Sequence, residues 1–301
     1  MWVLLAVFSA ILLGTYDVAK KQALRKNGTF AVLLVATALS TLFVSPFLRI
    51  GPAEDHLKLA LKAVLVTASW VSGMEGLKRL PLTTVSTIKG SRPVFVVLFS
   101  IILFGERLNW MQWLGIAIVL GALYMLGFTS RRDASAQVRK TGFIWMGISV
   151  LTGVASALYD KYIMKGMEPM FVQSWTNLFI TVILALCVLV KRLAISGRAS
   201  SDRLRPRSRE WEGALPASSD KFRWDWTLVL VAVLITGADA LYFFALKQPD
   251  ALLSIISVVR RASVLVTFVL GAIIFHEGNI RAKGLNMLLM AAGVVLLLIG
   301  S

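Results

Sequence analysis

Long apolar segments follow one another through most of this chain and constrain its fold more than any other feature. A helix needs about 20 residues to cross the hydrocarbon core of a bilayer, with a range of about 17–25. Ten segments reach or approach this length: residues 2–16, 30–48, 59–76, 82–104, 110–128, 142–159, 170–190, 226–246, 252–275 and 281–300. We therefore predict an all-α polytopic membrane protein with ten transmembrane helices, because a spanning helix satisfies its own backbone hydrogen bonds.

The composition favours a membrane protein over a soluble one. Hydrophobic residues make up 57% of the chain and charged residues 16%, whereas soluble domains are about half apolar and about a quarter charged. The net charge is nevertheless +16, from 32 basic and 16 acidic residues. Proteins that bind nucleic acid carry such charge on a soluble domain, so we predict no nucleic-acid partner.

Residue patterns that support catalysis are sparse. The single cysteine, Cys187, can form no internal disulfide, and the two histidines lie far apart without metal-ligand spacing. Phosphate-loop, nucleophile-elbow and metalloprotease motifs do not occur in the sequence. We predict no enzyme activity, no metal and no organic cofactor. The first apolar run has no basic region before it, which predicts no cleaved signal peptide.

The two halves of the chain resemble each other. Residues 13–17 (LGTYD) recur 143 positions later as SALYD, and residues 83–89 (TTVSTIK) recur 171 positions later as SIISVVR. A hydrophilic insertion at 191–225 in the second half explains the difference between the offsets. We predict two five-helix repeats, residues 1–128 and 142–301, joined by a loop at 129–141. Five helices is an odd number, so the repeats are inverted, as in many secondary transporters.

Basic residues are distributed unevenly over the connections between helices. The odd-numbered connections carry 21 of them and the even-numbered connections seven, with Lys62 counted among the seven. By the positive-inside rule, the odd-numbered connections are cytoplasmic and both termini lie outside. The expected location is the plasma (inner) membrane, with multiple passes.

Basic residues inside apolar runs are the strongest functional indication. They are Lys89, Arg92, Arg260 and Arg261, whereas only one acidic residue, Asp239, lies well inside a run. A central Lys or Arg costs at least about 2.5 kcal/mol on insertion, so it usually faces a cavity or a partner. The excess of cations predicts an anionic substrate. Alternatively, these side chains snorkel to an interface or bond carbonyls at helix ends. The repeat places Lys89 and Arg260 on opposite walls of one cavity.

Other polar residues near helix ends are further candidates. Asp17, Asp160 and Lys20 form either a gate that opens during transport or local ion pairs. Asp239 is either a proton-coupling site or the counter-ion of one of the two adjacent arginines. Glu106 is predicted to be a structural helix end. The remaining candidates for substrate binding are Tyr16, Tyr159, Ser86 and Ser257.

At these residues the chain resembles the drug/metabolite transporter superfamily, specifically its ten-helix EamA-type proteins. The similarity rests on GTYDVAK at 14–20, PVF at 93–95, FGE at 104–106, RRASVLV at 260–266 and FHE at 275–277. IKGSRPVF at 88–95 and VRR at 259–261 are similar to the triose-phosphate translocator branch, which implies that Lys89, Arg260 and Arg261 hold a substrate phosphate. Members of the superfamily commonly have cytoplasmic termini, opposite to the prediction from loop charge.

Together these features predict a secondary active transporter that exchanges a small anionic metabolite, phosphorylated or not, by alternating access. Exchange follows if the empty cationic cavity cannot close, since burying unneutralised charge is costly. One alternative is a proton-coupled exporter of amino acids or drug-like metabolites; another is a non-catalytic membrane subunit. The predicted partners are the anionic substrate and the lipid bilayer, with a homodimer left open.

Overall fold

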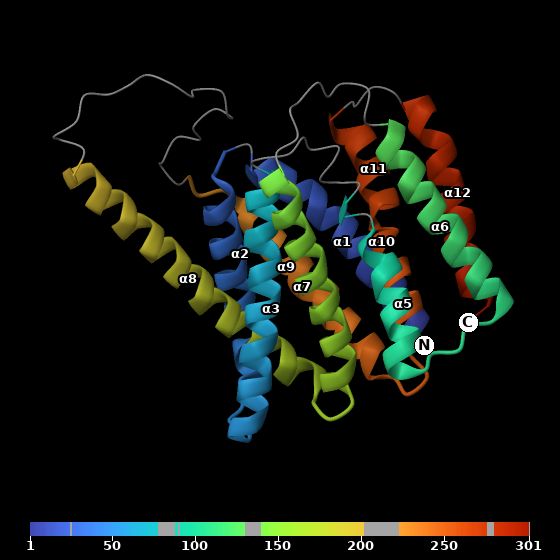
Figure 1. Ribbon diagram of the computed structural model, residues 1–301, viewed down its shortest axis with the longest axis horizontal. Helices are drawn as coiled ribbons and strands as arrows, with labels where there is room; N and C mark the ends of the chain where they lie inside the picture. Colours follow the sequence, from blue (N-terminus) through green and yellow to red (C-terminus); the bar gives the residue numbers. More distant parts are fainter. Residues whose placement is uncertain are drawn as a thin grey trace.

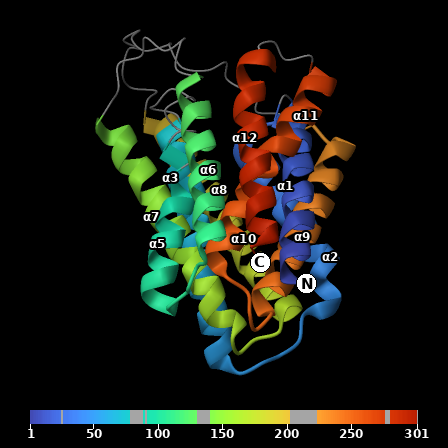
Figure 2. The ribbon, with the colours of Figure 1, turned by 90° about the vertical axis from the view of Figure 1, so that its right-hand side faces the viewer.

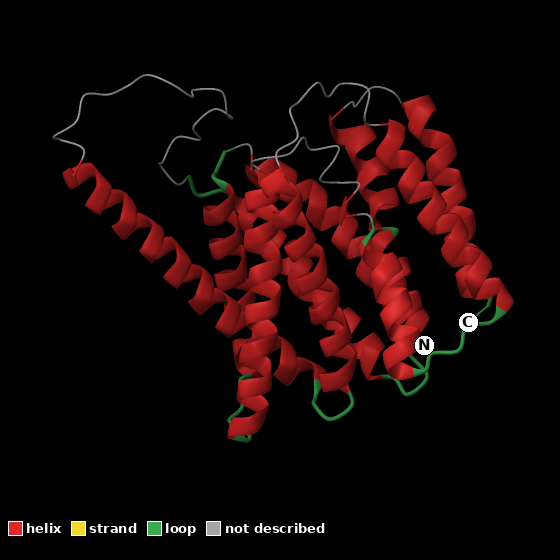
Figure 3. Ribbon diagram, in the orientation of Figure 1, coloured by secondary structure: helices red, strands yellow, loops and turns green. Residues whose placement is uncertain are grey.

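The computed structural model of this protein is a bundle of helices (Figures 1 and 3). It describes residues 1–24, 26–77, 88–89, 91–129, 140–201, 223–275 and 280–300, and all regular elements within these residues are helical. The elements are α1 (Trp2–Leu24), α2 (Thr29–Val44), η1 (Ser45–Phe47), α3 (Ala53–Leu77), α5 (Arg92–Phe104), α6 (Trp110–Thr129), α7 (Lys140–Met164), α8 (Pro169–Ser201), α9 (Trp226–Lys247), α10 (Leu253–Arg261), α11 (Ser263–Phe275) and α12 (Ile280–Ile299).

Six helical stretches in the described residues are long and apolar enough to cross a membrane. They are Trp2–Leu24, Phe30–Phe47, Ala53–Gly76, Thr141–Met164, Pro169–Val190 and Trp226–Lys247, and shorter apolar helices span Arg92–Phe104, Trp110–Met125 and Leu288–Ile299. Large apolar side chains are exposed along these helices, as at Ile102 (65%) and Leu288 (71%). Apolar side chains that face outward from long helices suit a lipid environment. The prediction of an all-α polytopic membrane fold is confirmed.

Both chain termini lie at one end of the bundle, together with the connections that leave α2, α5, α7 and α9 (Figure 1). At the opposite end, α1, α6 and α8 end and α2, α7 and α9 begin (Figures 1 and 2). We refer to these as the terminal end and the basic end, because the odd-numbered connections carry most of the basic residues. Which of the two ends faces the cytoplasm stays a prediction.

Polar contacts join the start of α9 to the turn between α1 and α2 at the basic end. Lys26 Nζ lies 2.5 Å from Asp225 Oδ2, and the Asn27 side chain both donates to and accepts from the backbone of Arg223. The hydrogen bond from Lys26 lowers the pKa of the Asp225 carboxyl. The stability that this contact adds is therefore present at neutral pH and is lost as the pH falls through the lowered pKa.

Helices of the first half pack against helices of the second half in matching pairs. α1 packs against α9 and α3 against α7, while α2 packs against α8 and α6 against α12. If each helix is replaced by its counterpart in the other predicted half, the α1–α9 pair becomes the α3–α7 pair. The α2–α8 and α6–α12 pairs stay the same. α6 and α12 approach closely at glycines: a Cβ on Gly115 would lie 2.8 Å from the carbonyl oxygen of Gly293. Small residues allow such close packing of membrane helices.

Several helix boundaries differ from the apolar runs. α1 continues to Leu24, because the polar residues at its end still form helical backbone bonds, and α8 continues to Ser201, into the predicted loop 191–225. The run 252–275 is not one helix: α10 ends at Arg261 and α11 begins at Ser263. Ser91, just before α5, is also in a turn, and 171 residues separate it from the break at Ala262. This is the offset of the sequence repeat. The apolar character of a segment predicts that it lies within the membrane, but it does not indicate where its helix is interrupted.

The N-terminus of α10 is anchored to the first half of the chain. Glu106 accepts backbone hydrogen bonds from Leu253 (2.6 Å) and Ser254 (3.0 Å), and its side chain is buried. A carboxylate at a helix N-terminus satisfies N–H groups that have no partner within the helix. Glu106 therefore has a structural place, as predicted, but it caps another helix rather than ending its own.

Candidate substrate cavity

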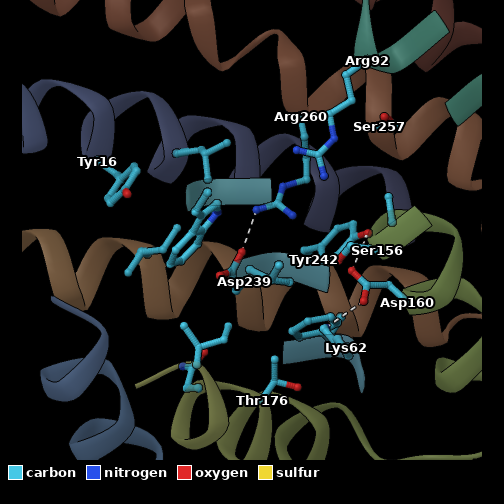
Figure 4. A pocket seen from close by; sticks show the side chains of 18 of the residues that line it. Tyr16, Lys62, Arg92, Ser156, Asp160, Thr176, Asp239, Tyr242, Ser257 and Arg260 are labelled. Carbon is cyan, nitrogen blue, oxygen red and sulfur yellow. Dashed lines mark hydrogen bonds and ion pairs between the residues drawn. The ribbon is translucent and has the colours of Figure 1, made fainter. Parts of the chain in front are cut away.

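A cavity of about 440 Å³ lies within the bundle, lined by residues of α1, α2, α3, α5, α7, α8, α9 and α10 and by Lys89. A cavity of this size suits a small molecule. Its charged lining residues are Lys20, Lys62, Lys89, Arg92, Arg260, Arg261, Asp160 and Asp239 (Figure 4 labels most of them). Six basic and two acidic residues leave an excess of four positive charges around the cavity.

Arg260 on α10 is held by two groups of α9. Its Nη2 lies 2.8 Å from Asp239 Oδ1, and its guanidinium carbon lies 4.2 Å from the centroid of the Tyr242 ring. Asp239 and Tyr242 are three residues apart on α9, so their side chains share one helix face. Asp239 is thus seen as the counter-ion of Arg260, one of the two roles predicted for it.

A second, deeper ion pair joins α3 to α7. Lys62 Nζ lies 2.8 Å from Asp160 Oδ1, and their side chains are only 3% and 9% exposed. The hydroxyl of Tyr242 donates to Asp160 Oδ2 at 3.3 Å, and Lys62 Nζ lies 3.9 Å from the centroid of the Phe243 ring. Through Tyr242 this pair is linked to Arg260 (Figure 4).

This pair corrects two sequence predictions. Lys62 is not part of a connection, because α3 begins at Ala53 and holds it one-third of the way along the helix. Asp239 is not the only acidic residue at membrane depth, because α7 runs on past the apolar residues and buries Asp160. The protein therefore neutralises some of its own intramembrane cations.

Lys89 is the basic residue most open to the cavity. Its side chain is exposed, and no carboxylate of the described residues lies within ion-pair distance of its ammonium. Lys20, Arg92 and Arg261 are all close enough to interact with it electrostatically. Four cations therefore gather at this part of the cavity.

The two arginines of this cluster also bond to backbone carbonyls. Arg261 Nη2 donates to the carbonyl of Lys89 at 2.6 Å, and Arg92 Nη2 donates to the carbonyl of Gly153 on α7. Gly153 allows this approach, since a Cβ there would lie 2.5 Å from the guanidinium carbon of Arg92. The segments that carry Lys89 and Arg261 are thus in direct contact. Arg260, the repeat counterpart of Lys89, instead turns to α9, and its position on a wall opposite Lys89 stays a prediction.

The remaining candidates are divided between the cavity and its surroundings. Tyr16 and Ser257 line the cavity, and the Lys20 ammonium lies 5.3 Å from the centroid of the Tyr16 ring. Asp17 does not line it but interacts electrostatically with Lys20 and Arg261. Tyr159 lies outside the cavity and stacks on Tyr162. Ser86 lies outside the described residues.

Sequence reasoning missed part of the lining. Lys62 lies inside an apolar run, so its position in the run could have revealed it. The sequence does not indicate that Tyr242 lines the cavity, because a tyrosine in an apolar run is equally suited to the membrane–water interface. Four uncharged polar residues on α2 and α8 were also missed: Thr37, Ser40, Thr176 and Asn177. Hydroxyl and amide groups are common in membrane helices, and only the packing shows which of them face a cavity.

Comparisons with known proteins show what this chain is similar to. Residues 1–128 match the model of the EamA-like transporter family. A Sinorhizobium sp. protein named "Uncharacterized transporter in cobO 3'region" is 29% identical over 136 residues, which cover 42% of this chain and 95% of that protein. The first two-fifths of the chain are thus similar to EamA-like transporters, as the sequence motifs predicted. A solved structure described only as "Crystal structure of protein" has the same fold, with a TM-score of 0.73, 15% identity and coverage of 98% of this chain and 95% of that one.

This similarity, together with the long apolar helices, indicates a multi-pass membrane protein of the kind that transports small substrates. The names of the family and of the relative agree with the prediction that it is not an enzyme. The Sinorhizobium relative is less than half as long as this chain, since the same alignment spans nearly all of one and under half of the other.

Proposed function

We propose that this transporter carries a small anionic metabolite and that Lys89 is the main contact for the anion. The observation that carries the proposal is the open ammonium of Lys89, surrounded by Lys20, Arg92 and Arg261 without a carboxylate in ion-pair distance. Like charges this close repel one another, and a bound anion relieves that repulsion. Arg261 and Arg92 use only part of their five donors on carbonyls, so each can also bond an oxyanion.

The same excess of charge supports exchange rather than one-way transport. Closing the cavity around uncompensated cations takes them out of water, which costs several kcal/mol per ion. A bound anion offsets that cost, so the loaded transporter crosses the closed state more readily than the empty one. An exchanger of anions in the plasma membrane is the function that these charges favour.

We further infer that the structure represents a conformation open towards the basic end. Lys89 is exposed, whereas Lys62, Asp160 and Tyr242, nearer the terminal end, are 2%, 7% and 6% exposed. Tyr242 and Phe243 of α9 rest on the Lys62–Asp160 pair and close this route. Opening towards the terminal end requires these contacts to part, which makes Asp160 a gate residue, with Lys62 rather than Lys20 as its partner.

An inverted-repeat architecture fits this inference. Helix contacts match when the two halves are exchanged, the two helix breaks are separated by the repeat offset, and the Sinorhizobium relative has about the length of one half. Two equivalent halves that meet at a central cavity can exchange their roles and so open it to either side of the membrane.

Counterflow into proteoliposomes tests the proposal. Vesicles are loaded with inorganic phosphate, propyl phosphate or butyrate, and uptake of the same labelled anion is measured. We expect uptake that requires an internal anion and falls at least about tenfold in Lys89→Gln, the loss of roughly one charge-assisted hydrogen bond. Arg107→Gln is the control, because Arg107 is an exposed cation outside the cavity. Uptake of neutral or cationic solutes only, or equal activity in both variants, would refute anion transport.

Asp239 supports a second candidate function, proton-coupled export. Its side chain is 32% exposed and holds Arg260, so protonation would release that guanidinium into the cavity. An imposed pH gradient then drives transport in the unmodified protein but not in Asp239→Asn. If the pH gradient has no effect on transport by either the unmodified protein or Asp239→Asn, the result supports exchange without proton coupling.

A further inference from the structure

We infer that the cavity wall formed by α2 and α8 is a second subsite, which binds the uncharged end of the substrate through hydrogen bonds. This inference rests on the proposed function, because the anionic end of the same molecule lies at Lys89. We call the wall the neutral wall and define it by Thr37 and Ser40 of α2 and Thr176 and Asn177 of α8. All the charged residues of the cavity come from other elements, so the two walls differ sharply in chemistry.

A chain of hydrogen bonds fixes the Asn177 amide. The hydroxyl of Thr236 donates to the carbonyl of Ala232 at 2.6 Å, so its single proton is used. Ser40, 2.6 Å from Thr236, must then donate to it, and Ser40 in turn accepts from Asn177 Nδ2 at 2.8 Å. The amide nitrogen therefore points to α2, and the amide oxygen is left to accept a hydrogen bond from a ligand.

The Thr176 hydroxyl lacks a partner among the described residues. The residue is only 4% exposed, and its Oγ1 is buried without a hydrogen bond. Figure 4 shows this side chain projecting from α8 towards the cavity, on the side opposite Arg260. Burying a hydroxyl without a partner is unfavourable, and a substrate group at this position removes the cost. Thr37 donates to the carbonyl of Leu33 at 2.9 Å and keeps a free lone pair.

These groups define the chemistry of the substrate's second end. Asn177 and Thr37 offer acceptors, and Thr176 can donate or accept, so the complementary groups are hydroxyls or amide N–H groups. The neutral wall has no carboxylate, so it does not favour an ammonium group. The cavity of about 440 Å³ limits the ligand to a small molecule. The substrate class is thus a small organic anion with a hydroxyl or amide at its far end.

Pairs of anions that differ in one terminal group test this inference. Competition against labelled propyl phosphate is measured for unlabelled propyl phosphate and 3-hydroxypropyl phosphate, and competition against labelled butyrate for butyrate, 4-hydroxybutyrate and 4-aminobutyrate. We expect the hydroxylated anion to compete about three- to tenfold better than its plain analogue, as one or two net hydrogen bonds allow. The amino analogue should compete no better than the plain one.

Variants of the neutral wall separate binding from packing. Thr176→Val and Asn177→Leu keep the side-chain size and should bring the preference for the hydroxylated probe close to one. Thr176→Ser restores a hydroxyl and should restore the preference. Thr152→Val is the matched control, because the Thr152 hydroxyl donates to Ile148 within α7 and does not line the cavity.

The outcomes distinguish the subsite from the proposed function. Equal competition by hydroxylated and plain anions, both dependent on Lys89, overturns the neutral wall and leaves anion transport intact. Better competition by the amino analogue also overturns it. If both Thr176→Val and Asn177→Leu still prefer the hydroxylated probe, the substrate hydroxyl binds at another site and the neutral wall is overturned. Absence of transport for every anion overturns both proposals together.

Discussion

Replacing Asp160 by Asn should destabilise the folded protein by about 3–5 kcal/mol, the usual cost of leaving one charge of a buried pair without its partner. The structure sets the conditions for that cost. Lys62 and Asp160 are 2.8 Å apart with side chains 3% and 9% exposed, so water cannot replace the lost carboxylate. The ring of Phe243 also lies against the Lys62 ammonium, but it does not remove its charge.

A nearby exposed pair makes the argument specific to burial. Lys58 and Glu54, on the same helix as Lys62, are 2.6 Å apart, closer than the buried pair, but the Glu54 side chain is 76% exposed. Water solvates both charges there, so Glu54→Gln should leave stability almost unchanged. Distance alone would predict the opposite ranking of the two substitutions.

Unfolding of the purified protein in detergent, followed by tryptophan fluorescence against denaturant, measures the difference. A double variant, Lys62→Met with Asp160→Asn, should recover much of the lost stability, because it leaves no charge in the buried site. The reasoning fails if Asp160→Asn is as stable as Glu54→Gln, or if the double variant is no more stable than the single one.

Two further predictions concern residues that hold the cavity in shape. Gly153→Val should reduce anion counterflow at least tenfold, because a Cβ there displaces the Arg92 guanidinium, whereas Gly147→Val on the same helix meets open space and should transport normally. Equal activity in the two variants would contradict this. Glu106→Gln should lower the unfolding free energy by about 2 kcal/mol, the loss of charge-assisted bonds to the start of α10, while Glu168→Gln at an exposed site serves as the control in the same unfolding assay.

The sequence predicted the helices well where one physical requirement dominated. A membrane helix must be apolar over about 20 residues, so composition alone indicated where α1, α2, α3, α7, α8 and α9 lie. It failed at ends and breaks. α8 runs on to Ser201, and the break at Ala262 splits an unbroken apolar run, since neither feature depends on hydrophobicity.

The candidate site was predictable in part for the same reason. Lys89 and Arg260 were found because a cation in an apolar run is costly and so carries information. Lys62 lies inside the predicted run 59–76 and was open to the same argument, whereas Asp160 lies just beyond the run 142–159, where a charge is common. Thr176 and Asn177 are polar without charge, and such residues occur in membrane helices for many reasons.

The sequence by itself determined that this chain is a polytopic helical protein with an excess of positive charge inside the membrane. Both properties are sums over residues, and the order of residues along the chain is enough to count them. Only the tertiary structure decided which cations are neutralised and which remain open. Lys62 meets Asp160, and Arg260 meets Asp239, whereas Lys89 meets none of the described carboxylates. Pairing depends on distances of a few ångströms between side chains of separate helices, and those distances are set by packing.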